Sequence, residues 1–112
     1  MSEGQPSRHG QLVKLLPHKR ELYLQLHAAV WPEVESQIRR SHIGNYTIFL
    51  HGDLLFSFFE YSGTDLQADL DQMAADPATQ AWWALTAPCQ EPLEGTPASA
   101  TWAEGVEVWH LD

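Results

Sequence analysis

The sequence is short of cysteine and of basic residues, and each shortage excludes a class of protein. Cys89 is the single cysteine, so it can form neither an internal disulfide nor a paired-thiol metal site, and we interpret it as a packed or partly exposed thiol. Only 6 Lys and Arg stand against 15 Asp and Glu, which gives a formal net charge of −9. Because binding to nucleic acid needs a basic surface, we expect no nucleic-acid partner.

Long apolar runs are missing as well. No run approaches the roughly 20 residues that a transmembrane helix needs, and the first seven residues contain no apolar block of the signal-peptide type. The histidines form no HExxH motif and no close pair with the cysteine. We therefore expect a cytoplasmic protein with no membrane partner and no metal site.

Aromatic residues, in contrast, are abundant. A chain of 112 residues contains five Trp, three Tyr and four Phe. Flat rings pack against the C–H face of a sugar, and Tyr and Trp can also hydrogen-bond its oxygens. The same rings could form an ordinary hydrophobic core, so their positions have to decide between the two interpretations.

The chain length suits one compact domain, which we place at residues 10–112, after a flexible N-terminal segment at residues 1–9. Four short runs of apolar or alternating residues predict strands, and Gly52 permits a tight turn between the middle two. The predicted strands are residues 10–16, 45–50, 54–61 and 106–111.

The segment between the first two strands has a helical period. Counting about 100° per residue along residues 17–41 puts an apolar arc on one side and charged residues such as Glu35 and Arg39 on the other, solvent-facing side. Pro32 lies inside this segment and removes a backbone donor, so the helix should bend or restart near Trp31 and Pro32. The apolar arc consists of Leu22, Leu26, Val30, Val34 and Ile38.

Two more helices are predicted after the hairpin. One starts at Thr64 or Asp65, and the next is opened by Asp76 as N-cap and Pro77 in the first helical position, continuing to about Ala87. The resulting order, β-α-β-β-α-β, predicts a ferredoxin-like α+β fold, an antiparallel sheet with helices on one face.

The strand at residues 54–61 has apolar side chains on both of its alternating faces. Helices would bury one face, and a second copy of the chain could bury the other. We therefore expect a homodimer.

A group of polar aromatic residues lies on the first helical segment. Tyr23, His27 and Trp31 are spaced i, i+4 and i+8, so their side chains follow one helix face at or near the apolar arc. A lone histidine there would usually be a core residue bonded to a backbone carbonyl. Here a hydroxyl and an indole flank a group that titrates near neutral pH, which also suits a catalytic site.

Two further positions add to this candidate site. Trp82 and Trp83 are adjacent on a predicted helix, where successive side chains point about 100° apart, so one ring can pack while the other faces a cavity. Tyr46 adds a hydroxyl from the second strand, although it could also be a ring at the edge of the core.

These residues resemble the L-rhamnose mutarotase family, and the matching segments follow the family's order over nearly the whole chain from Gly10. A Tyr-x-x-x-His-x-x-x-Trp-Pro-Glu motif followed by a Trp-Trp pair is a specific combination. The matching segments are residues 23–33, 42–46, 54–56, 80–83 and 107–111.

The resemblance implies a dimeric ferredoxin-like isomerase that needs no cofactor and interconverts the α and β anomers of L-rhamnose or a related 6-deoxy-hexose. The position matching His27 would be the proton donor. The turn at residues 51–53 is shorter than is usual in the family, which could alter the rim of the pocket. The positions matching Tyr23, Tyr46, Trp82 and Trp83 would hold the monosaccharide.

Opening a sugar ring needs a proton delivered to the ring oxygen and another withdrawn from the anomeric hydroxyl. The sequence leaves open whether a tyrosine, a carboxylate or water takes the second proton. Two other classes of function also stay open: a ferredoxin-like monooxygenase that works without a cofactor, and a non-catalytic module that binds a sugar or another metabolite.

Overall fold

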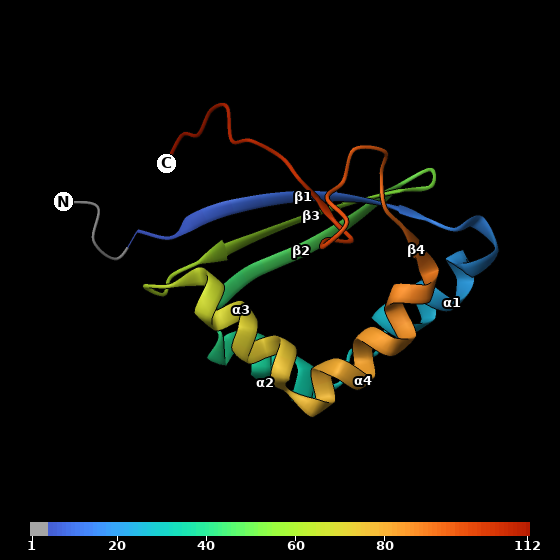
Figure 1. Cartoon of the computed structure of the whole chain (residues 1–112), viewed down its shortest axis with the longest axis horizontal. Coiled ribbons are helices and arrows are strands. Elements are labelled where there is room, and N and C mark those ends of the chain that lie inside the picture. The colour runs from blue at the N-terminus through green and yellow to red at the C-terminus, as the bar shows by residue number, and fades with distance from the viewer. Residues whose placement is uncertain (1–4) are drawn as a thin grey trace.

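The computed structural model describes residues 5–112 as an antiparallel sheet with all helices on one face (Figure 1). The strands pair in the order β2-β3-β1-β4, and β5 also pairs with β1. This arrangement confirms the predicted α+β class with helices on one face. The strands are β1 (Ser7–Leu15), β2 (Ile43–His51), β3 (Leu54–Tyr61), β4 (Gln90–Glu91) and β5 (Ala103–Glu104).

The predicted first helix is divided, as expected, at Pro32. Pro32 is the first residue of α2, where the missing backbone N–H has no helical partner to lose. Leu22, placed on the inner arc by the sequence, is exposed, while Tyr23 is buried. That expectation was wrong because the count of 100° per residue does not continue across the break. The first helices are η1 (Pro17–Lys19), α1 (Arg20–His27) and α2 (Pro32–Arg40).

The later helices begin where the sequence predicts. The Asp65 carboxylate accepts the Ala68 N–H at 3.1 Å, and the Asp76 carboxylate accepts the Thr79 N–H at 2.9 Å. Such N-caps satisfy backbone donors that the first turn leaves unpaired. Within residues 5–112, no helix is long and apolar enough to cross a bilayer. The helices are α3 (Leu66–Ala75), α4 (Pro77–Thr86) and η2 (Ala87–Cys89).

The predicted hairpin is formed by β2 and β3. Gly52 has a φ of 59° in the two-residue turn, a conformation that glycine adopts without steric cost. Near its start, β2 shifts register between Gly44 and Thr47, and Asn45 has a φ of 47°. A bulge of this kind re-aims the side chains around it, and Tyr46 lies inside it.

Two hydrophobic clusters fill the space between the sheet and the helices. The first contains Val13, Leu15, Tyr23, Leu55 and Cys89. The second contains Ile43, Phe59, Tyr61 and Met73. The complete burial of Cys89 agrees with its interpretation as a packed thiol.

Part of the segment that the sequence predicts to be flexible belongs to the sheet. Residues 7–9 belong to β1 and pair with residues 59–61 of β3, because β3 is long enough to offer them a partner. The expectation of a flexible segment was therefore wrong for residues 7–9. Its first part, residues 1–4, lies outside the described residues.

The predicted closing strand at residues 106–111 is not a strand in this single chain. The chain before this segment pairs with β1 only through β5 and through one further hydrogen bond, which the Gly105 N–H donates to the Gly10 carbonyl oxygen at 2.8 Å. Beyond it, Val106, Val108 and Trp109 are 87%, 92% and 76% exposed. The prediction of a strand here was wrong, because within residues 5–112 no strand pairs with this segment (Figure 1).

Candidate active site

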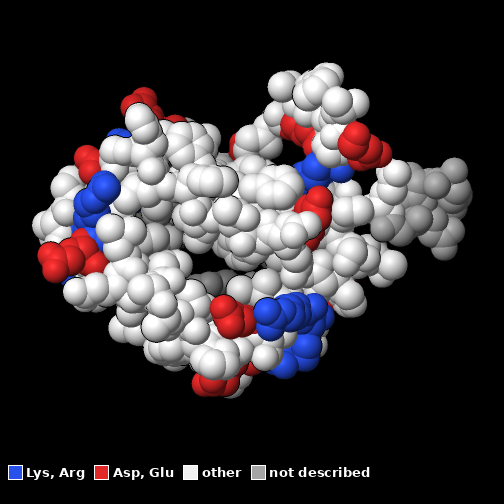
Figure 2. All heavy atoms as spheres, turned by 180° about the vertical axis from the view of Figure 1, so that it is seen from behind, with Lys and Arg blue, Asp and Glu red and all other residues white. Residues whose placement is uncertain are grey.

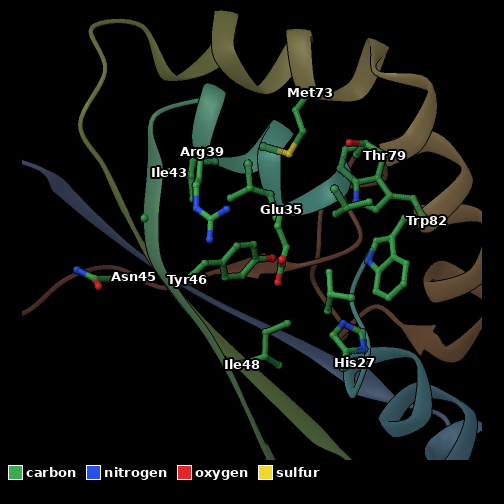
Figure 3. Close-up of a pocket in the computed structure, with 15 residues that line it drawn as sticks. His27, Glu35, Arg39, Ile43, Asn45, Tyr46, Ile48, Met73, Thr79 and Trp82 are labelled. Atoms are coloured by element: carbon green, nitrogen blue, oxygen red, sulfur yellow. The ribbon is translucent and has the colours of Figure 1, made fainter. Parts of the chain in front are cut away.

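A cavity of about 500 Å³ opens between the helices and β2 (Figure 3). Its lining comes from α1, α2, β2 and α4, and it includes Ile43 and Met73 of the second hydrophobic cluster. Seen from behind, the molecule shows a hollow in largely uncharged surface, with acidic and basic groups near its rim (Figure 2). Four of the five site residues predicted from the sequence line this cavity: His27, Tyr46, Trp82 and Trp83.

His27 is the last residue of α1 and is fixed through one ring nitrogen. Its Nδ1 lies 2.9 Å from the Tyr23 backbone oxygen. Because a carbonyl oxygen only accepts, Nδ1 carries the hydrogen of this bond, which leaves Nε2 for a ligand. The imidazole thus has the backbone partner expected of a core histidine and also faces a cavity.

The imidazole is also held between two aromatic rings. It stacks on Tyr23 with ring centroids 4.2 Å apart, and it meets the edge of Trp82 at 5.4 Å. These contacts restrict the ring to one orientation, so Nε2 keeps a constant direction relative to the cavity.

Tyr23 lies beneath His27 and is not part of the cavity lining. Its hydroxyl accepts a hydrogen bond from Gln90 Nε2 at 3.4 Å. Burial raises the pKa of Tyr23 to about 12, although the Gln90 bond partly opposes this shift. Tyr23 therefore supports the imidazole from behind and stays protonated at neutral pH.

Tyr46 projects from the β2 bulge into the cavity (Figure 3). The residue is 42% exposed overall, but burial around its hydroxyl raises the pKa above the usual value for tyrosine. A phenol that keeps its proton is a hydrogen-bond donor to a ligand oxygen.

The tryptophan pair on α4 divides as the sequence suggested. Trp82 is only 5% exposed and meets the Trp31 ring at 5.2 Å, whereas Trp83 is 42% exposed. Both line the cavity. Trp82 therefore contributes to the core and to the pocket wall, while Trp83 lies on the more open side.

Glu35 and Arg39 also line the cavity, and the sequence interpretation missed them (Figure 3). The helical count assigned them to solvent because it cannot tell open water from a solvent-filled hollow. The usable signal was an acidic and a basic residue one helical turn apart, on the helix that begins within the Trp-Pro-Glu motif. Within residues 5–112, no three His, Cys, Asp or Glu side chains come together as a metal site.

Comparisons with known proteins agree with this fold. The family model described as L-rhamnose mutarotase matches residues 8–111. The L-rhamnose mutarotase of Lactiplantibacillus plantarum is 30% identical over 105 residues, which cover 94% of this chain and 98% of the relative. That of Oceanobacillus iheyensis is 27% identical over 108 residues, with the same two shares of 94% and 98%.

Solved structures show how widely the fold is used. The crystal structure of an L-rhamnose mutarotase from Formosa agariphila matches with a TM-score of 0.73 at 21% identity, over 95% of this chain and 99% of that one. Tetracenomycin F2 cyclase from Streptomyces glaucescens, a type-II polyketide cyclase, matches with a TM-score of 0.63 at 15% identity, over the same shares of 95% and 99%. The fold alone therefore does not define the reaction. The match to the family model over residues 8–111 does define the family: this chain belongs to the L-rhamnose mutarotases.

Proposed function

We propose that this chain interconverts the α and β anomers of L-rhamnose, or of a closely related 6-deoxy-hexose, in the cavity beside His27. The observation that best supports this is an imidazole with one nitrogen bonded to the backbone and the other left for a ligand, in a hollow walled by indole and phenol rings. Membership of the L-rhamnose mutarotases supports the substrate class. Such an enzyme is an isomerase.

The chemistry requires proton transfer at the ring oxygen of the sugar. Protonated His27 would donate from Nε2 to that oxygen as the ring opens to the aldehyde, and it would take the proton back on closure. Acid–base help of this kind typically accelerates a reaction by about 10²–10⁴. The Nδ1 bond to Tyr23 keeps the ring in the tautomer that this role needs.

The other predicted site residues would hold the sugar. The protonated Tyr46 hydroxyl would donate to a ring hydroxyl, and the faces of Trp82 and Trp83 would pack against the deoxy methyl group and the C–H face. Tyr23 would position His27 without touching the sugar, since it is not part of the lining.

Anomer exchange measured by NMR on L-rhamnose at equilibrium tests this proposal. We expect the purified protein to accelerate exchange well above the buffer rate, with L-fucose and D-glucose as comparison sugars. Binding of L-rhamnose with exchange at the buffer rate would instead identify a non-catalytic binding module. Oxygen consumption with an aromatic substrate would identify a monooxygenase.

The protein is further proposed to act as a homodimer. Phe49 and Phe56 are paired across β2 and β3 on the sheet face away from the helices, where both are exposed, and residues 106–111 add another uncovered apolar surface. Burying one large apolar side chain is worth about 1.5–3 kcal/mol, so a second copy that covers these surfaces would be strongly stabilised. Light scattering coupled to gel filtration should give twice the chain mass, and a monomer at micromolar concentration would contradict the proposed dimer.

The cytoplasmic location stays a prediction, which fractionation of expressing cells would test.

A further inference from the structure

Among the described residues that line the cavity, Glu35 is the one carboxylate. Its side chain leaves α2 and points into the hollow, as do His27 and Tyr46 from other elements (Figure 3). Arg39, one turn further along α2, lines the same cavity. The reaction proposed above needs a second group that exchanges protons with the sugar, and the cavity offers few ionisable side chains for it.

The position of Glu35 is set by a helix held firmly against the core. Its backbone N–H donates to the Trp31 carbonyl at 3.1 Å in the first turn of α2. Val34, the preceding residue, is buried and packs this turn of α2 against the core, and both Val34 and Glu35 line the cavity. The N-terminal turn of a helix also favours negative charge.

The carboxylate is not occupied by another contact. In the part of the chain that the structure describes, the ion pairs are Arg8 with Glu107, His42 with Asp69 and His110 with Asp112, and none includes Glu35. An ionised carboxylate without a cation partner accepts protons and hydrogen bonds readily.

We propose that Glu35 is the second proton-transfer group of anomer interconversion, acting opposite His27; this rests on the proposed function. The two tyrosines are poorer candidates for a base. Burial raises the pKa of Tyr46 and brings that of Tyr23 to about 12, so both keep their protons at neutral pH, and Tyr23 does not line the cavity.

The proton and electron transfers balance in each direction. On opening, Glu35 takes the proton of the anomeric hydroxyl, the C1–O1 bond becomes a carbonyl, and the C1–O5 bond breaks. The electron pair of that bond goes to the ring oxygen, which takes a proton from His27 Nε2. After rotation about C1–C2, the ring oxygen attacks the other carbonyl face, returns its proton to His27, and the new anomeric oxygen takes the proton from Glu35.

Three substitutions on α2 test this assignment. Glu35→Gln keeps the size of the side chain but removes the base, and Glu35→Asp keeps the base on a shorter stem. Glu33→Gln is the matched control, because it removes an exposed carboxylate from the same helix, and this carboxylate lies outside the cavity lining. Polarimetry on freshly dissolved α-L-rhamnose gives kcat and KM for each, and circular dichroism verifies the fold.

We expect Glu35→Gln to lower kcat by about 10²-fold or more with little change in KM, Glu35→Asp to restore part of the rate, and Glu33→Gln to behave as wild type. The rate of the wild type should fall on both sides of its pH optimum, and Glu35→Gln should lose the fall on the acid side. A Glu35→Gln variant with wild-type kcat, or with only a raised KM, would overturn the role of Glu35. An inactive wild type would instead overturn the proposed function itself.

Discussion

The two faces of the sheet are covered to very different degrees within one chain. On the helix face, Val13 and Leu55 are fully packed, and the cavity with its imidazole is built from side chains of this chain alone. On the opposite face, Phe49 is 62% exposed and residues 106–111 extend past the last strand without cover. Within the described residues, the helix face therefore holds a cavity lined by this chain, whereas the outer face leaves large apolar side chains uncovered.

The largest effect should come from the helix face, at His27. His27→Gln removes the imidazole ring and should lower anomer exchange by about 10²–10⁴-fold, while the fold stays intact because the residue is only partly buried. NMR exchange and circular dichroism measure the two quantities. Exchange at the wild-type rate in a folded variant would reject the catalytic role of His27.

Trp82 and Trp83 test whether one wall of the cavity is also core. Trp82 is almost buried, so Trp82→Ala should lower the free energy of unfolding by about 3–5 kcal/mol. Trp83 is much more exposed, so Trp83→Ala should chiefly raise KM for the sugar and cost less stability. Urea denaturation and polarimetry separate the two, and equal losses of stability would contradict this division.

On the outer face, removing residues 106–112 should dissociate the proposed dimer. The deleted segment contains four exposed large apolar residues, and burying each would contribute about 1.5–3 kcal/mol. Gel filtration with light scattering should show a shift to monomer. Phe49→Asp, on the neighbouring sheet face, is the companion variant; a truncated chain that stays dimeric would place the interface elsewhere.

The smallest effect should come from Tyr23→Phe. The variant keeps the ring that stacks on His27 and loses one hydrogen bond with Gln90, so stability should fall by about 1 kcal/mol. Because Tyr23 does not line the cavity, KM should remain near the wild-type value. A large rise in KM would show that its hydroxyl reaches the sugar.

The sequence predicted best those features that depend on neighbouring residues. The cap at Asp76, the restart at Pro32 and the turn at Gly52 are all local signals, and all are found in the structure. A cap satisfies a backbone N–H group, the ring of proline removes one, and glycine permits a positive φ. None of these effects depends on the rest of the fold.

Features that depend on distant residues were harder to predict. Leu22 was misplaced because the helix count was continued across a break. Glu35 was assigned to solvent because a helical period cannot show that the polar side of α2 borders a hollow. Residues 106–111 alternate like a strand, but alternation does not specify which edge, or which chain, would pair with them.

The buried thiol of Cys89 can report how often the hydrophobic core around it becomes exposed. Cys89 has no exposed surface, and burial raises its pKa, so the thiol resists alkylation while the fold is closed. It is the single cysteine of the chain, and therefore every labelling event reports the same place in the core. The speed of labelling would measure how often that region becomes accessible in solution, without a dye or an added reporter group.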